Sequence, residues 1–391
     1  MLAGGGRVPT ARRRIGAAIA LAALAAIPGV SPAMSLEDFR DPEDGRFDTS
    51  RFLLDLKGFL PMPILITEPA VGYGGGAALL FFSRNPQPEG GAGSGRRFHP
   101  PDITVAGAIA TENGTRGGFA GHLGFSSDGK WRYLGGVGRM TLNLAYYGDP
   151  LFPGSIASDG LDYTLKADVG IVDVRRRIGS SDWMAGLRYV YAGTESAFDA
   201  GRPAEVPARQ LDMAVGGLAL LAEYDDRDSI FTPGSGTRFT AYVHDFGKPY
   251  GGDQSFRLYN AAVNHYASLH RNVVLGARFD YRASSGDTPF YALPFIELRG
   301  IPALRYQGES VAVAELEGRW NLDGRWSLVG FAGAGKASAR GGDLGSADTR
   351  WAGGIGFRYY LARALGLHAG IDVARGPEEG AIYLILGSAW R

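Results

Sequence analysis

From about residue 59 onward, apolar and polar residues alternate along segments of 10 to 14 residues, and turn-rich breaks separate these segments. In 271–283 the odd positions carry apolar side chains such as Phe279, whereas the even positions include Arg278 and Asp280. A period of two places successive side chains on opposite faces of an extended chain. The segments are therefore predicted to be β-strands with one apolar face and one polar face.

The same alternation recurs in three further segments, 161–171, 349–361 and 365–373. In 161–171, apolar residues at the odd positions oppose charged residues such as Lys166 and Asp168. Charged faces of this kind suit a hydrated lumen, whereas apolar faces suit contact with lipid. We therefore expect the charged faces to point inward.

Sixteen segments fit this description, and an even number of strands is typical of single-chain bacterial barrels. Tight turns are expected on the periplasmic side of such a barrel and longer loops outside. The tight turns are 112–115, 322–324 and 375–379, and the longer connections are 84–101, 194–208 and 285–308. The predicted strands are 59–67, 70–83, 102–112, 116–126, 131–145, 160–173, 181–193, 209–224, 236–247, 254–268, 271–284, 309–321, 325–337, 348–361, 364–375 and 380–390.

A soluble β-sandwich would show the same alternation, with its apolar faces turned inward. Two features favour a membrane barrel instead. The segments match the ~9–11 residues that a tilted strand needs to cross a bilayer, and aromatic residues recur near their ends, as in interfacial girdles. These aromatic residues are Tyr146, Tyr147, Trp183, Tyr189, Tyr191, Tyr359, Tyr360 and Trp390. The predicted fold class is all-β, a transmembrane antiparallel β-barrel of about 16 strands.

The composition is consistent with a barrel and argues against several other classes. Glycine accounts for 60 of the 391 residues and 45% of the residues are hydrophobic, a combination that suits curved, tilted strands. The formal net charge is zero, so we expect no basic surface that recruits nucleic acid. The chain has no cysteine, which excludes disulfides, zinc–thiolate sites and thiol catalysis.

The first 33 residues have the organisation of a secretory signal peptide. Arg7 and the arginines at 12–14 precede the apolar run 15–30, and small residues at 31–33 offer a cleavage site. A membrane-anchoring helix is the alternative, but the run is short and rich in alanine. We expect export to the outer membrane, with a signal peptide over 1–33, a short acidic periplasmic segment over 34–58 and the barrel over 59–391.

Four short motifs follow one another along the predicted barrel. The run Leu60–Gly76 opens it with a glycine-rich hairpin, and a pattern D-x-R-D followed by P-x-x-G comes later. The residues of that second motif are Asp225, Arg227, Asp228, Pro233 and Gly236. The third motif lies in a long connection and consists of Leu298, Arg299, Gly300 and Ile301. The fourth is an E-x-R pattern formed by Glu317 and Arg319.

In these motifs, and over about residues 59–391, the chain resembles the barrel domain of the BamA/TamA superfamily, the bacterial surface antigen family. The family includes outer-membrane protein insertases and two-partner secretion translocases. The resemblance implies that the long connection folds back into the lumen, where Arg299 is anchored against carboxylates of the wall. A bidentate arginine pair makes such an anchor geometrically specific.

The chain departs from the family pattern at the position that receives this arginine. In the family a strand aspartate helps to receive the loop, but Gly333 stands there in this sequence. Glu315 and Glu317 share one strand face with Arg319. We therefore expect one of these two glutamates to bind Arg299.

The resemblance implies a non-enzymatic protein in outer-membrane assembly or in polypeptide or lipid transport, without cofactor or metal, gated between its first and last strands. No client-binding module precedes the barrel in this sequence, so we expect a member that lacks periplasmic modules. The expected partners are outer-membrane lipids and lipopolysaccharide, unfolded outer-membrane or secreted polypeptides, and the barrel-assembly machinery that inserts the chain. That machinery reads a terminal aromatic residue in the family, whereas Trp390 is penultimate here.

Two alternatives remain open from the sequence, a passive porin-like channel and an outer-membrane enzyme that modifies lipids. The enzyme would use Ser268 with His265 or His270, although strand alternation places Ser268 and His265 on opposite faces. A phosphate-binding loop is not expected at 330–336, because Ala337 stands where serine or threonine would bind magnesium. The six histidines show no metal-binding spacing, and a calcium site at Asp225 and Asp226 is less expected than a turn.

Overall fold

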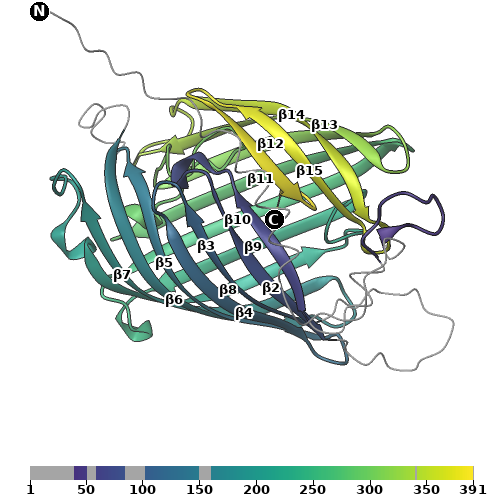
Figure 1. The fold of residues 1–391 in the computed structure, drawn as a ribbon. Coiled ribbons are helices and arrows are strands. Elements are labelled where there is room, and N and C mark those ends of the chain that lie inside the picture. The colour runs from purple at the N-terminus through teal and green to yellow at the C-terminus, as the bar shows by residue number, and fades with distance from the viewer. Residues whose placement is uncertain (1–38, 51–58, 84–101, 149–159, 340, 391) are drawn as a thin grey trace, which may run out of the picture.

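The computed structural model describes residues 39–50, 59–83, 102–148, 160–339 and 341–390. They form one antiparallel sheet of 16 strands, in which each strand is hydrogen-bonded to the next one along the chain. The sheet curls into a nearly closed barrel (Figure 1). The strands are β1 (Phe59–Ile66), β2 (Gly74–Ser83), β3 (Asp102–Thr111), β4 (Arg116–Phe125), β5 (Trp131–Tyr146), β6 (Leu161–Arg177), β7 (Trp183–Phe198), β8 (Asp212–Asp225), β9 (Gly236–Phe246), β10 (Phe256–His270), β11 (Val273–Gly286), β12 (Ser310–Asn321), β13 (Trp326–Ser338), β14 (Thr349–Ala362), β15 (Leu367–Arg375) and β16 (Gly380–Leu386).

All 16 predicted strands are present, and the prediction of an all-β barrel is confirmed. Four strand ends were placed wrongly by four or more residues, and two of these strands, β6 and β7, extend to Arg177 and Phe198 rather than to residues 173 and 193. The strand β2 starts at Gly74 rather than at residue 70, because the 3-10 turn η3 (Pro69–Val71) comes first. The strand β16 ends at Leu386 rather than at residue 390, because Gly387 has a φ of 80° and turns the chain away from the sheet. No helix in the described part of the chain is long and apolar enough to span a membrane.

Apolar side chains cover the outside of the barrel and charged side chains line its inside. Leu220 in β8 and Ile355 in β14 point outward and are 69% and 72% exposed. In contrast, Asp280, Arg358 and Asp372 point inward and are at most 3% exposed. This distribution is the reverse of that in a soluble protein and is the one that contact with lipid requires.

The two ends of the barrel are distinguished by strand parity. We call the end where an odd-numbered strand leads to an even-numbered one the loop end, and the opposite end the turn end. The loop end carries the long connections 199–211 and 287–309, and the turn end carries tight connections such as 178–182 and 271–272.

The length of a connection was a poor guide to the end at which it lies. The tight connections 112–115 and 376–379 lie at the loop end, contrary to the prediction. The long connection 84–101, which is outside the described residues, joins β2 to β3 and so belongs to the turn end. Strand parity fixes the end because each antiparallel strand reverses the direction of the chain.

The prediction of which face points inward is wrong for 161–171, although the alternation itself is present. Tyr163 of β6 is buried inside the barrel, whereas Lys166 and Asp168 are exposed on the outside. Asp168 pairs there with Arg139 of β5. The strands β5 to β8 have 14 to 17 residues, more than the ~9–11 that cross a bilayer. Their loop-end halves therefore project beyond the lipid and carry charges outward.

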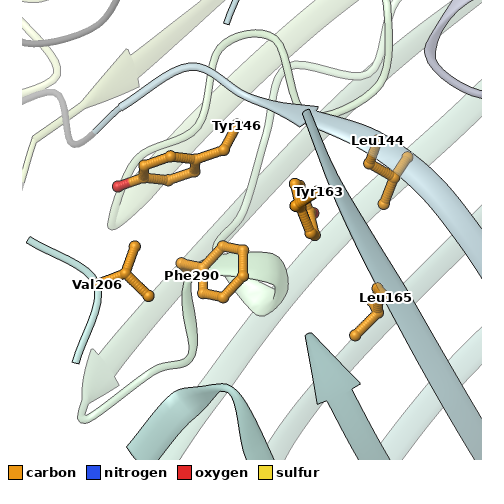
Figure 2. Packing of buried hydrophobic residues seen from close by; sticks show 6 residues of the cluster. All are labelled: Leu144, Tyr146, Tyr163, Leu165, Val206 and Phe290. Carbon is orange, nitrogen blue, oxygen red and sulfur yellow. The ribbon is translucent and has the colours of Figure 1, made fainter. Parts of the chain in front are cut away.

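An apolar cluster fills the lumen at the loop end. Tyr146 of β5 and Tyr163 of β6 contact the ring of Phe290, which belongs to the connection 287–309, with centroid distances of 5.5 and 5.2 Å. Figure 2 shows that Phe290 lies between Tyr146, Tyr163 and Val206. The long connection is therefore held inside the barrel by aromatic packing.

Three of the aromatic residues predicted for an interfacial girdle lie inside the barrel instead, and one of them, Tyr360, stacks on His368 of β15 on the inner face that also carries Arg358. Tyr146 is 5% exposed in the apolar cluster, and Trp390 is 4% exposed in the lumen. Trp183, Tyr189 and Tyr191 point outward, as a girdle requires. Position near a strand end therefore did not reveal which face an aromatic residue occupies.

Residues 39–50, which belong to the predicted periplasmic segment 34–58, form an acidic loop at the turn end (dark purple, at the right of Figure 1). Its carboxylates surround Arg325 of the β12–β13 connection, whose side chain is fully buried. Asp44 accepts a hydrogen bond from Arg325 Nε at 2.7 Å, Asp48 accepts one from Nη1 at 2.6 Å, and Asp41 binds Nη2. The signal peptide predicted for 1–33 lies outside the described residues.

Substitution of Leu220 tests the assignment of the lipid-facing side. Arginine at this outward position near the middle of β8 is expected to destabilise the barrel by about 2–4 kcal/mol, because it places a charge against hydrocarbon. Denaturant unfolding in phospholipid vesicles measures the change. The Leu220→Ala control introduces no charge and should cost much less, so equal stability of the two variants would contradict the assignment.

The acidic loop should be insensitive to pH over the neutral range. The hydrogen bond from Arg325 lowers the pKa of Asp44 from 3.8 to about 2. Because folding lowers this pKa, the stabilisation is fully present above the unfolded value and is lost as the pH falls toward the folded value. A nitroxide at the exposed position Arg40→Cys should become mobile only between about pH 4 and pH 2. Increased mobility already at pH 5, without a parallel change for a label at Arg209→Cys in the loop-end connection, would rule out this ionic attachment.

Candidate functional site

The connection 287–309 folds back into the lumen, as the family resemblance implies. The backbone N–H of Phe290 donates to Gln210 Oε1 at 3.1 Å, and a bridge between Phe295 and Gln307 joins the two arms of the connection. The residues Leu298 to Ile301 lie between these arms. The motif is therefore presented at the tip of a braced loop.

Arg299 is buried against three carboxylates of the barrel wall. Its Nη2 donates to Glu315 Oε1 at 2.6 Å and to Glu317 Oε2 at 2.7 Å, and both acceptors lie on β12. Its Nη1 donates to Asp372 Oδ2 of β15 at 2.6 Å. The guanidinium carbon also lies 3.5 Å from the ring centroid of Phe331 on β13. The arginine side chain thus joins the loop to three wall strands, and it is only 9% exposed.

Each of the two most buried carboxylates has a second donor. Glu315 accepts a hydrogen bond through Oε2 from Trp390 Nε1 at 2.7 Å. Asp372 accepts one through Oδ2 from Arg358 Nη2 at 2.9 Å. Charges removed from water are costly unless their remaining hydrogen-bonding positions are satisfied. The additional donors thus satisfy hydrogen-bonding positions of Glu315 and Asp372 that Arg299 alone would leave open.

Burial alone would lower the pKa of Arg299, but the adjacent carboxylates of Glu315, Glu317 and Asp372 outweigh it and raise the pKa above its usual value. Arg299 is therefore a permanent cation. A planar guanidinium can donate to several carboxylates at once, which the ammonium group of lysine cannot do in the same geometry. The site is a fixed structural anchor, because every acidic group at Arg299 is engaged in an ion pair.

The other residues of the loop motif fit the wall by shape. Leu298 and Ile301 are buried in an apolar cluster with Val311 and Val313 of β12. A side chain at Gly333 would come within 2.7 Å of Leu298, so the absence of one makes room for the loop. At position 333, where the family pattern has aspartate, glycine therefore leaves the space that the side chain of Leu298 occupies.

Gly300 allows the loop to approach the end of β15 closely. Its φ is 97°, a conformation that favours glycine, and a Cβ there would lie 2.8 Å from the backbone carbon of Arg375. The backbone N–H of Gly300 donates to the hydroxyl of Tyr383 on β16 at 2.9 Å. The motif thereby also contacts the last strand of the sheet.

The motif predicted between β8 and β9 forms a turn at the turn end. Asp225 accepts two hydrogen bonds of 2.8 Å from the guanidinium of Arg227, and Asp228 accepts one from the N–H of Gly234 at 2.9 Å. Gly236 has a φ of 99°, which the turn requires. No calcium is needed to account for these carboxylates, because main-chain and arginine donors satisfy them.

Arg319 does not take part in the anchor of Arg299. It faces the same lumen, but its Nη2 donates to the carbonyl oxygen of Pro233 at 3.0 Å. Arg319 therefore ties β12 to the turn motif of β8 and β9. The two motifs recognised separately in the sequence meet at this contact.

The residues considered for other chemistries lie apart from one another. Ser268 Oγ donates to the carbonyl of Gly234 at 3.0 Å, and His265 Nδ1 shares a hydrogen bond of 2.9 Å with Thr237. No hydrogen bond joins Ser268 to a histidine among the described residues. Lys336 lies on β13 and donates to the carbonyl of Gly345 at 2.9 Å. Within the described ranges, no three His, Asp or Glu side chains form a possible metal site.

Sequence reasoning missed four groups of the anchor, Asp372, Phe331, Trp390 and Tyr383. Asp372 lies in the alternating segment 365–373, but nothing in the local pattern links it to Arg299. Trp390 was assigned to the membrane interface. Gly387 ahead of it was the signal that the chain leaves the sheet there.

Replacement of Arg299 tests the anchor. Arg299→Met leaves three carboxylates without their shared cation, and breaking a buried ion pair in this way is expected to destabilise by about 3–5 kcal/mol. We expect faster proteolysis within the connection 287–309 and larger, fluctuating single-channel currents in planar bilayers, because the loop is released. Arg299→Lys should rescue only in part, and Arg271→Met at an exposed site of the β10–β11 turn is the control. Wild-type loop protection in Arg299→Met would refute the anchor.

No protein-family model and no curated protein sequence matches the chain. The solved structures that are similar to it include three barrels. BamA from Haemophilus ducreyi lacking POTRA domains 1–3 has 10% identity and a TM-score of 0.52, over 83% of this chain and 68% of that one. CdiB from Acinetobacter baumannii has 12% identity and a TM-score of 0.56, over 85% and 60% of the two chains. CdiB from Escherichia coli has 11% identity and a TM-score of 0.58, over 83% and 62%.

This chain spans about two thirds or less of the length of these proteins. At 10–12% identity the likeness concerns the arrangement of the strands and not the activity. The fold implies a location in the bacterial outer membrane. The chain thus has the β-barrel fold shared by BamA and CdiB, the fold that its four sequence motifs imply.

Proposed function

We propose that this chain is a non-enzymatic outer-membrane barrel of the BamA/TamA superfamily that moves polypeptide or lipid by opening laterally between its first and last strands. The observation that carries the proposal is the seam between β1 and β16. Each of these strands has only one hydrogen-bonded neighbour among the described residues. A strand edge with unpaired backbone groups is a liability that proteins usually cover or block. A barrel that retains two such edges is therefore expected to use them in its function.

The strand β16 is well suited to move. It has 7 residues, whereas β5 to β8 have 14 to 17, so fewer backbone hydrogen bonds hold it to β15. Its own chain continues inward at Gly387 instead of extending along β1. A short strand that is paired on one side has a low cost of local opening.

The lumenal anchor touches the moving side of the proposed seam. Tyr383 of β16 accepts the N–H of Gly300, and Trp390, which follows β16, donates to Glu315. Movement of β16 would therefore disturb the partners of Arg299. This coupling supports a role for the loop in setting whether the seam is open.

The proposal also defines partners. Outer-membrane lipids and lipopolysaccharide would surround the apolar face, and unfolded outer-membrane or secreted polypeptides would be the clients. The barrel-assembly machinery would insert the chain itself after removal of residues 1–33. The turn end would face the periplasm and the loop end the outside.

A passive porin and a lipid-modifying enzyme are less well supported. The connection 287–309 and residues 387–390 occupy the lumen, which leaves less room for a steady pore. The lipid enzyme would need a serine–histidine pair, and Ser268 and His265 bind separate partners. Sustained conductance of the wild-type barrel would favour the porin.

Locking the seam tests the proposed gating. The chain has no cysteine, so Leu65→Cys in β1 and Ile382→Cys in β16 can be joined by a flexible bis-maleimide. Both positions point outward. A deletion strain is complemented with each form, and envelope integrity and the surface proteome are measured. We expect the locked barrel to fail, because the client path crosses the seam.

The matched control joins two strands that are already paired. Val263→Cys and Phe279→Cys are opposite each other on β10 and β11, so a linker there leaves the seam free. This form should complement like the wild-type chain. Full complementation by the barrel locked at the seam would exclude lateral gating.

A further inference from the structure

A cavity of about 410 Å³ lies in the lumen beside the anchor of Arg299, and Trp390 belongs to both. Its floor is the inner face of β9, β10 and β11, and its roof comes from the connection 287–309 together with Trp390. This volume falls within the range of about 300–1,000 Å³ that is usual for small-molecule sites. The cavity is thus large enough for a ligand rather than for a single water molecule.

The floor presents an amide that no described residue binds. Asn264 of β10 is only 6% exposed. Neither its amide oxygen nor its amide nitrogen takes part in a hydrogen bond with the described residues, and the side chain lines the cavity. The neighbouring Asn260 is engaged, since its Nδ2 donates to Asp280 at 2.9 Å. The amide of Asn264 offers a donor and an acceptor to whatever fills the cavity.

The charges around the cavity cancel. Arg278 and Arg282 of β11 both pair with Asp280 of the same strand, and Arg282 also pairs with Glu297 of the roof. Two cations therefore face two anions, and the site has no net charge to attract an ion such as phosphate. Guanidinium and carboxylate groups that are held in pairs still have edges that hydrogen-bond to hydroxyl groups.

Aromatic and hydroxyl groups complete the lining. Tyr242 of β9 and Phe295 and Trp390 of the roof contribute rings. The Tyr242 hydroxyl, like the Thr240 hydroxyl beside it, has no hydrogen-bond partner among the described residues. Rings combined with planar polar groups suit a ligand that has apolar C–H faces and a rim of hydroxyls.

We propose that this cavity binds a small neutral polyol of the saccharide class. A peptide fits less well, because the backbones of β9, β10 and β11 are paired on both sides and offer no edge for strand addition. The floor of the cavity lies on β9 to β11, whereas its roof includes Trp390, which follows β16. Such binding gives the lumen a role in addition to any transport.

The test uses the full barrel in a detergent without a sugar headgroup. Saturation-transfer NMR measures binding of D-glucose, N-acetyl-D-glucosamine and maltose, with inorganic phosphate and triglycine as comparison probes. We expect saturable binding of at least one saccharide. Asn264→Ala should weaken it about tenfold, because the buried amide loses its hydrogen bonds to the ligand. Asn143→Ala, outside the cavity on β5, should leave the affinity unchanged.

A second variant keeps the test independent of any folding defect in the first. Ala262→Phe fills the cavity from β10 and should abolish binding while circular dichroism shows an intact barrel. The proposal is overturned if none of the three saccharides binds, or if binding is the same in both cavity variants. It is also overturned if phosphate or triglycine binds in a manner that depends on Asn264 and the saccharides do not.

Discussion

The buried cation of Arg299 is the interaction on which the interior of the barrel depends. Three carboxylates from two strands on opposite sides of β13 and β14 converge on it. Charges held out of water are costly unless they are paired, so the cation and the carboxylates stabilise one another in the lumen. The connection 287–309 is thus held by reciprocal charge neutralisation, and the aromatic contacts at Phe290 set its path into the barrel.

The anchor also explains why a barrel with an open seam keeps its shape. Glu315 and Asp372 lie on β12 and β15, so Arg299 braces the wall beside β16 from within. A sheet that ends in two free edges would otherwise gain by pairing them. Here the contacts of Arg299 inside the lumen hold β12 and β15 in place. The edge strands β1 and β16 are each hydrogen-bonded on one side only among the described residues.

The sequence was sufficient for the strands and for the loop motif, because both depend on local patterns. Alternation located β11 and β14, and the glutamates near Arg299 followed from their shared strand face. The same alternation could not tell inside from outside in β6, since a strand that projects beyond the lipid can reverse which face is polar. Nor could it reveal Asp372, because its contact with Arg299 is made across the lumen between residues 73 positions apart. Contacts of that kind depend on barrel curvature, which no local period encodes.

The acidic loop at the turn end has a consequence for the order of assembly. Asp48 and Arg325 are 277 positions apart in the chain, and Arg325 reaches its buried position only between β12 and β13. Contacts of such long range form late, because the intervening chain must be ordered first. Protection of Arg325 by the three aspartates therefore marks a barrel whose last strands are in place. Formation of the contacts between the acidic loop and Arg325 is therefore expected to be one of the last steps of folding.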